Sequence, residues 1–279
     1  MLSIVYGLLA ALGWGAADFT GGLASRRTGA YRTVLYGEAV GLVFIIGAVV
    51  ATKEAHPAWL ALALAAAAGA IGTTGLLMLY HALATGKMSI ATPVSALMAA
   101  SIPALAGMLL QGFPGWLTLM GFGLSLAAIW LISREEGNNT RVLVHIRELR
   151  LPLLAGIGFG TYFILMHQAA QTALFWPMLA SRSGGMWIML LYIALRRDTW
   201  RVTGGAWPYI ILNSLLDAGG NAMYLLAARS GRMDVAAVLS SLYPAGTVLL
   251  AALLLRERVA RSQSLGILLA LLAILFLPL

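Results

Sequence analysis

The chain has 279 residues, of which 61% are hydrophobic and only 10% are charged, and its mean hydropathy is +0.88. Soluble domains are about 45–50% apolar and about 25% charged, so this composition excludes a water-soluble fold. The absence of cysteine excludes disulfides and thiolate metal sites. The net charge of +8 therefore has to be interpreted by where the basic residues lie along a polytopic membrane protein.

Apolar runs of about 20 residues, the length that crosses a bilayer as a helix, follow one another along the whole chain. They do not alternate with a period of two, which excludes a transmembrane barrel. The first run follows no basic segment and is long enough to span, so we expect a retained helix and not a cleaved signal peptide. We predict an all-α membrane protein with ten transmembrane helices, at about residues 2–23, 34–51, 58–83, 91–110, 115–133, 151–171, 174–195, 207–228, 235–255 and 263–278.

A polar stretch at residues 134–150 stands close to the midpoint of the chain. We expect it to be a linker that contains a short surface helix from Val142 to Leu149. It divides the chain into a first five-helix repeat at residues 1–133 and a second one at residues 151–279.

The two halves match each other at a constant offset of 145 residues, without gaps. Each half holds five predicted helices, an odd number, so the second half enters the membrane with opposite polarity. We therefore expect two inverted repeats, the architecture that exposes a central site alternately to either side. The matching pairs are Gly13 and Gly158, Gly15 and Gly160, Gly75 and Gly220, Met78 and Met223, Gly86 and Gly231, Met88 and Met233, Ser95 and Ser240, Leu97 and Leu242, and Gly121 and Gly266.

The basic residues are distributed unequally between the two sides of the predicted bundle. Fourteen of the 18 Lys and Arg fall on one side, three fall on the other, and Arg182 lies inside a span. The positive-inside rule places the fourteen in the cytoplasm and both termini outside. The basic charge is thus a topology signal that also attracts anionic lipid headgroups, and it does not indicate a nucleic-acid partner.

The stretch at residues 231–277 resembles the end of an EamA-type repeat of the drug/metabolite transporter superfamily. The opening segment at residues 11–19, ALGWGAADF, is similar to the Leu-Trp-Gly with which the family begins. The resemblance covers nearly the whole chain, in two copies. Near the C-terminus it is carried by Tyr243, Pro244, Glu257, Gln263 and Gly266.

This resemblance implies ten helices arranged as five plus five and alternating-access transport of small molecules, often export. It also implies a cavity lined mainly by the first, third, fourth, sixth, eighth and ninth helices, and cytoplasmic termini, in conflict with the loop charges. Two positions depart from the family pattern. Gly112 stands where the second repeat has Glu257, and the Arg that is frequent in the second helix of a repeat is matched by Arg182 but not by Gly37.

Ionisable side chains inside the predicted spans are the first candidates for function, because each costs at least about 2.5–3.5 kcal/mol at mid-bilayer. They are Asp18, Glu38, His81, His167, Arg182 and Asp217. Asp217 is the strongest candidate, because it belongs to a stripe that follows one face of the eighth helix: Asn213, Asp217, Asn221 and Tyr224. Such a stripe is either a cavity wall, with Asp217 as a charge partner or proton acceptor, or an interhelical hydrogen-bond seam.

Asp18 lies one turn from Trp14 in the first helix. It is expected to pair with a substrate amine, to bind a proton, to pair with Arg182, or to lie near the headgroups. Glu38 and Arg182 occupy adjacent repeat positions, which predicts either two opposite gates or one salt bridge. We favour a gating or structural role for them over ligand contact.

Two histidines lie within predicted helices. His81 follows Tyr80 at the end of the third helix and is either interfacial or part of the site. His167 shares a helix face with Gln171, and because histidine titrates near physiological pH it is a candidate proton relay.

The fourth and ninth helices carry Ser95 and Ser240 at equivalent positions, with Ser241 and Tyr243 close by in the sequence. Prolines at 93 and 244 interrupt the backbone of these helices, which frees carbonyls for a cavity. The alternative is that the serines bond back to their own helix. Tyr162, Trp187 and Tyr224 are candidates for aromatic walls, or for packing.

No catalytic triad, phosphate-binding Gly loop or metal-ligand cluster is present, so we expect neither an enzyme nor a bound cofactor or metal. We predict a multi-pass inner-membrane transporter that exports a small polar or amphipathic metabolite, such as an amino acid, by alternating access. Proton coupling through Asp217 or His167, gated by Glu38 and Arg182, is part of this prediction. The alternatives are an organic-cation exporter, a channel or lipid scramblase, and a non-transporting assembly partner. Both a monomer and a dimer through the fifth and tenth helices fit the sequence.

Overall fold

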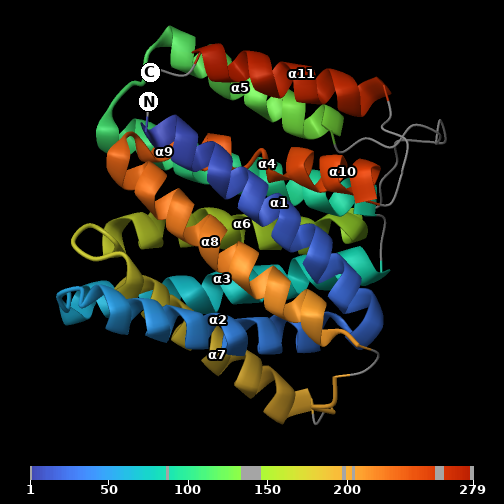
Figure 1. The fold of residues 1–279 in the computed structure, drawn as a ribbon. Helices are drawn as coiled ribbons and strands as arrows, with labels where there is room; N and C mark the ends of the chain where they lie inside the picture. Colours follow the sequence, from blue (N-terminus) through green and yellow to red (C-terminus); the bar gives the residue numbers. More distant parts are fainter. Residues whose placement is uncertain are drawn as a thin grey trace.

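The computed structural model describes residues 2–85, 88–132, 146–196, 199–202, 205–254 and 261–276. Within these ranges every regular element is an α-helix, and the helices lie side by side with their connections gathered at two ends of the bundle (Figure 1). The helices are α1 (Leu2–Thr28), α2 (Ala30–Thr52), α3 (Trp59–Thr85), α4 (Met88–Gln111), α5 (Trp116–Ile132), α6 (Ile146–Ala169), α7 (Phe175–Arg196), α8 (Trp207–Ser230), α9 (Met233–Ser240), α10 (Tyr243–Leu254) and α11 (Arg261–Phe276).

Six helices of the described chain are long and apolar enough to cross a membrane, and three shorter apolar segments accompany them. The all-helical, multi-pass membrane fold is therefore confirmed, whereas the count of ten crossings stays a prediction. The predicted surface helix from Val142 to Leu149 falls partly outside the described residues, and α6 begins inside the predicted linker, at Ile146.

The ninth predicted span is divided into two helices. Pro244 has no N–H group to donate to the carbonyl four residues before it, so the helical ladder is interrupted there. The Leu242 N–H donates to the Leu239 carbonyl at 3.1 Å, and the Ala245 N–H donates to the Leu242 carbonyl at 2.9 Å. The expectation of one continuous helix at residues 235–255 is corrected to α9 and α10, separated by a buried two-residue turn.

The offset of 145 residues is visible in the helix boundaries. Phe175, Met233 and Arg261, which begin α7, α9 and α11, lie 145 residues after the residues that begin α2, α4 and α5. The helices α1 and α6 run in opposite directions through the bundle (Figure 1). The two halves thus repeat one structural plan with inverted direction.

Glycines bring the first helix of each half against the third helix of the other half. A Cβ atom on Gly13 of α1 would lie 3.2 Å from the Cα of Gly220 in α8, and one on Gly158 of α6 would lie 3.4 Å from the Cα of Gly75 in α3. These two crossings are related by the same offset. Because small residues let helix backbones approach closely, they fasten the two halves together.

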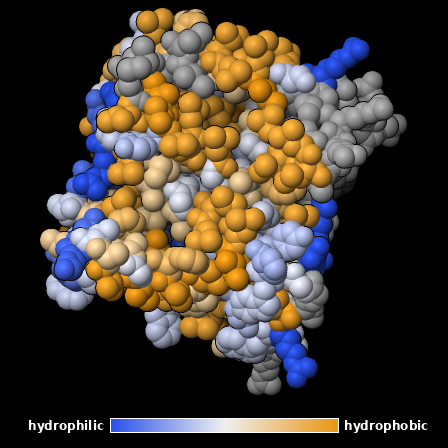
Figure 2. All heavy atoms as spheres, viewed as in Figure 1, coloured by the Kyte–Doolittle hydropathy of each residue, from blue (hydrophilic) through white to orange (hydrophobic). Residues whose placement is uncertain are grey.

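The outer surface of the bundle is apolar. Figure 2 shows a broad hydrophobic face, with hydrophilic residues gathered toward its left and right margins, where the helices end. Trp187, predicted as a candidate cavity wall, is 73% exposed on the outside of α7. This distribution fits a bundle whose helices cross the bilayer and whose side chains contact lipid.

Candidate functional site

A cavity with a volume of about 110 Å³ lies in the middle of the bundle, between the two halves. Its walls come from α1, α2, α3, α4, α6, α7, α8 and α10, so α2 and α7 join the helices that the family resemblance implied. A single buried water needs only about 10–15 Å³, so this cavity is large enough for a small solute. The polar and charged residues that line it are Asp18, Thr73, Glu38, Tyr162, Ser181, Arg182, Asp217, Asn221 and Tyr243.

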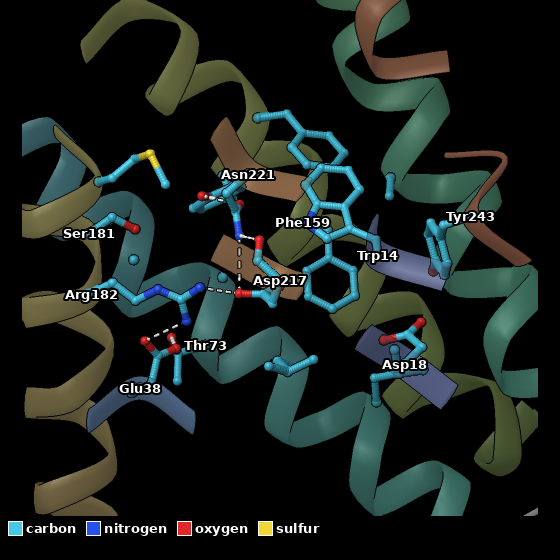
Figure 3. Close-up of a pocket in the computed structure, with 18 residues that line it drawn as sticks. Trp14, Asp18, Glu38, Thr73, Phe159, Ser181, Arg182, Asp217, Asn221 and Tyr243 are labelled. Atoms are coloured by element: carbon cyan, nitrogen blue, oxygen red, sulfur yellow. Dashed lines mark hydrogen bonds and ion pairs between the residues drawn. The ribbon is translucent and has the colours of Figure 1, made fainter. Parts of the chain in front are cut away.

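Arg182 of α7 is held between two carboxylates (Figure 3). Its Nη1 atom lies 3.1 Å from Glu38 Oε2 of α2, and its Nη2 atom is bound to Asp217 Oδ2 of α8. The Thr73 hydroxyl of α3 donates to Glu38 Oε1 at 2.8 Å. Of the two predicted arrangements of Glu38 and Arg182, the salt bridge is therefore the one that forms. The buried charges of this salt bridge have partners in both halves of the chain: Glu38 and Thr73 in the first half, and Arg182 and Asp217 in the second.

Two glycines make room for this ion pair where α2 crosses α7. A Cβ atom on Gly185 would lie 3.1 Å from the Glu38 carboxyl group, and one on Gly41 would lie 3.2 Å from the Arg182 guanidinium carbon. The absence of both side chains lets the long Arg182 and Glu38 side chains lie between the helices.

The polar stripe of α8 serves both purposes that the sequence suggested. The Asn221 amide donates to Asp217 Oδ2 at 3.1 Å, and the Tyr162 hydroxyl of α6 donates to Asn221 Oδ1 at 2.6 Å, so these groups form a cavity wall. Asn213 and Tyr224 instead bond to backbone carbonyls of α1 and α6. Asn213 and Tyr80 line a smaller neighbouring cavity of about 30 Å³.

Asp18 lies at the border of the two cavities and lines both. No hydrogen bond or ion pair joins its carboxylate to another residue in the described part of the chain. The alternative that Asp18 pairs with Arg182 is corrected, because that guanidinium is occupied by Glu38 and Asp217. The Tyr243 side chain is directed toward Asp18 (Figure 3).

Part of the cavity wall is aromatic. Trp14 stacks on Phe163, with ring centroids 5.3 Å apart and planes at 16°, and Phe163 lies 4.5 Å from the Tyr224 ring. Phe159 and Tyr162 continue this surface along α6. The cavity is therefore lined by aromatic rings as well as by carboxylates, and Figure 3 shows Trp14 and Phe159 between Asp217 and Asp18.

Six predicted site residues lie outside both cavities: His81, Ser95, His167, Gln171, Tyr224 and Ser240. His81 and Gln171 are exposed near helix ends, and the Gln171 amide donates to the His167 carbonyl at 2.6 Å. Ser95 and Ser240 are fully buried, but in the described residues their hydroxyls have no hydrogen-bond partner, so the predicted bond back to their own helix is absent.

Sequence reasoning did not select Thr73, Ser181, Phe159 or Met178, which also line the cavity. One signal was available for α3, where glycines recur at positions 69, 72 and 75 on one helical face. Such spacing marks a face that other helices approach closely.

Comparison with known proteins gives one family. The model of the "EamA-like transporter family" matches residues 1–134 and 149–278. No curated protein matches the chain. A solved structure titled "Crystal structure of protein" has a similar fold, with a TM-score of 0.80 over 98% of this chain and 95% of that one, at 15% sequence identity.

Proposed function

This protein belongs to the EamA-like transporter family, and we propose that it is a secondary active transporter of a small amine-bearing organic cation. The observation that carries the substrate class is the charge of the central cavity. Asp18, Glu38 and Asp217 face it together with a single cation among the lining residues, Arg182. The carboxylates thus exceed the guanidinium by two negative charges when all are ionised, and a cationic solute complements that excess.

Asp18 is the proposed partner of the substrate amine. Arg182 is already bound to two carboxylates, whereas Asp18 forms no ion pair with a basic residue in the described part of the chain. A zwitterion such as an amino acid, which the sequence favoured, would need Arg182 to leave Glu38 or Asp217 in order to bind its carboxylate. An amine requires no such rearrangement.

The aromatic wall favours a substrate whose cation is attached to a flat or apolar body. Trp14 lies beside Phe159 and Phe163 within the same cavity as Asp18. Ring faces attract cations and also stack with apolar groups. A substrate with one ring and one amine therefore finds a stacking partner and a charge partner in the same cavity.

Proton coupling follows from the same charge argument. A cavity carboxylate without a cationic partner is neutralised either by a bound proton or by the substrate amine. If both compete for Asp18, an inward proton gradient drives the amine outward, as an exchange. The inverted repeat supplies the two access states that such an exchange requires.

The test is a thermal-stability screen of the purified protein with matched ligand pairs. Each aromatic or aliphatic amine is paired with its N-acetylated counterpart, beside amino acids and organic anions. A ligand at 100 times its Kd should stabilise the protein by about 2.7 kcal/mol. We expect amines to stabilise the parent protein, their acetylated counterparts to fail, and Asp18→Asn to lose the effect. Equal stabilisation by acetylated amines, or stabilisation by anions alone, contradicts the proposal.

Counterflow in proteoliposomes then separates a carrier from the channel alternative. A carrier exchanges labelled for unlabelled amine with saturation, whereas a pore gives flux that rises linearly with concentration. Linear flux contradicts alternating access even if the amine binds.

A further inference from the structure

Glu54, just beyond the end of α2, is bound to the beginning of α7. Its Oε1 atom accepts a hydrogen bond from the Leu174 N–H at 2.6 Å, and its Oε2 atom accepts from the N–H groups of Phe175 at 2.8 Å and Trp176 at 3.3 Å. The first N–H groups of a helix have no partner within the helix, and a carboxylate there also complements the helix dipole. One side chain of the first half thus caps a helix of the second half.

The same connection is reinforced by rings. The Trp176 indole donates to the Glu54 backbone carbonyl at 3.0 Å, and the His56 ring packs against Trp176 and Trp59 with centroids 4.9 and 4.8 Å away. The loop between α2 and α3 is therefore fastened to the start of α7 by both backbone and side-chain contacts.

A second connection lies where α7 ends and α2 begins. The Tyr31 hydroxyl donates to the Thr199 backbone carbonyl at 3.1 Å, and Arg32 Nε donates to the same carbonyl at 3.0 Å. A further bond joins the Arg32 guanidinium to the Thr199 hydroxyl. Here the second half is fastened to the first.

These two connections are equivalent under the repeat. Thr199 follows Glu54 by 145 residues, and Trp176 follows Tyr31 by the same number. In each connection, an aromatic side chain on the second residue of a helix donates to the backbone carbonyl of the equivalent loop residue. Because the halves are inverted, one contact is built twice, at opposite ends of the antiparallel pair formed by α2 and α7.

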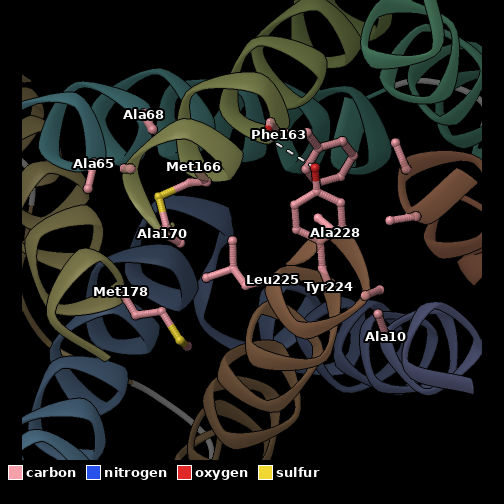
Figure 4. Packing of buried hydrophobic residues seen from close by; sticks show 14 of the residues in the cluster. Ala10, Ala65, Ala68, Phe163, Met166, Ala170, Met178, Tyr224, Leu225 and Ala228 are labelled. Carbon is pink, nitrogen blue, oxygen red and sulfur yellow. Dashed lines mark hydrogen bonds between the residues drawn. The ribbon is translucent and has the colours of Figure 1, made fainter. Parts of the chain in front are cut away.

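The two ends of this helix pair are separated by the cavity. In the middle of the helix pair, Glu38 of α2 is bound to Arg182 of α7, and both residues line the cavity. Along α6 and α8, Met166 and Leu225 come one turn after the cavity residues Tyr162 and Asn221, and they belong to a packed core that also includes Phe163 (Figure 4). A passage to the Glu54 end therefore requires this core to part and α7 to move relative to the loop that carries Glu54.

We infer that Glu54 and Thr199 are the two gate residues of the transport cycle. The Glu54 contact closes the cavity toward one membrane face and the Thr199 contact closes it toward the other, and each half-cycle opens one contact while α2 and α7 pivot at Arg182. The inference rests on the proposed alternating-access function but not on the identity of the substrate. The loop charges predict that the Glu54 end faces outward.

The test uses the absence of cysteine in the natural chain. Ser181→Cys places one thiol in the cavity wall. Its labelling by a small, membrane-impermeant methanethiosulfonate reagent is measured in right-side-out and in inside-out vesicles, without substrate. In this background, Glu54→Gln should raise labelling from the Glu54 face by roughly tenfold, because it removes charge-assisted hydrogen bonds that favour the closed state. Arg32→Ala should raise labelling from the opposite face.

Two further variants keep the result interpretable. Trp176→Phe retains the ring but removes the indole donor, and should raise labelling from the Glu54 face by a smaller factor. Thr52→Ala is the matched control, because among the described residues this exposed hydroxyl bonds only to the Ala48 carbonyl of its own helix, and it should change nothing. Only variants that elute with the parent in size-exclusion chromatography are compared.

Equal increases from both faces in Glu54→Gln would show a general loosening and overturn the gate assignment, as would unchanged labelling from both. Because no substrate is present, a wrong substrate class leaves this labelling pattern intact. Failure of the gates and failure of the amine proposal are thus distinguishable.

Discussion

The guanidinium of Arg182 in α7 is bound to the carboxylate of Glu38 in α2, at 3.1 Å, although the two residues belong to different halves of the chain. The same guanidinium also binds Asp217 in α8. One buried cation thereby joins three helices at the centre of the bundle. Because this cation lies between two carboxylates, a change in the charge of the cavity also changes the attraction between the three helices.

Replacing Arg182 should destabilise the protein strongly. Arg182→Met leaves two carboxylates without their cation, and breaking a buried ion pair by removing one partner costs about 3–5 kcal/mol. Arg182→Lys keeps the charge but cannot bind both carboxylates with a planar fork, so we expect an intermediate loss. Thermal unfolding in detergent measures both. Equal stability of Arg182→Met and the parent would show that the ion pairs of Arg182 with Glu38 and Asp217 do not stabilise the fold.

The sequence makes Asp217 a candidate for proton coupling beside Asp18, and Asp217→Asn should therefore uncouple transport from the proton gradient. The substitution keeps a side chain of the same shape beside Asn221 but removes one of the two carboxylates that hold Arg182. We expect uptake driven by a pH gradient to be abolished in proteoliposomes, while counterflow of labelled substrate continues. Normal pH-driven accumulation in this variant would remove Asp217 from the coupling mechanism.

Removing one hydroxyl tests the wall between α6 and α8. Tyr162→Phe deletes the bond to Asn221 Oδ1 at 2.6 Å and leaves the ring in place. We expect a loss of about 1 kcal/mol in unfolding free energy, the usual contribution of one hydrogen bond. Substrate affinity should fall with it, because Asn221 orients Asp217. Tyr192→Phe is the control, because Tyr192 is half-buried near the end of α7 and lines neither cavity, and it should leave affinity unchanged.

The sequence predicted features that depend on local periodicity. The stripe from Asn213 to Tyr224 was readable because a helix returns to one face every three to four residues, and two of its members line the cavity. The 145-residue offset also survives in the helix starts. Each of these signals needs only the distance between residues along the chain.

What could not be predicted depends on which helices meet. Arg182 had several potential carboxylate partners, and only the packing of α2, α7 and α8 selects Glu38 and Asp217. His167 was a reasonable candidate by residue type, yet it lies one turn beyond Phe163 along α6, outside the cavity that Phe163 and Tyr162 line. Glu54 lies in a loop, where no periodicity marks it, and its contact is visible only from the N–H groups at the start of α7 that it binds.

Glycine substitutions should separate close packing from mere flexibility. A Cβ atom on Gly184 of α7 would overlap the backbone carbonyl of Ala66 in α3, so Gly184→Ala has to push these helices apart. Gly219 of α8 has no atom within 4 Å of an added Cβ, and alanine favours a helix over glycine by about 1 kcal/mol. We expect Gly184→Ala to lower the Tm and to reduce ligand-induced stabilisation, because Ser181 and Arg182 lie on the same helix. Gly219→Ala should leave both unchanged or raise the Tm slightly. Similar losses in the two variants would mean that the backbone contact between α3 and α7 does not position the cavity wall.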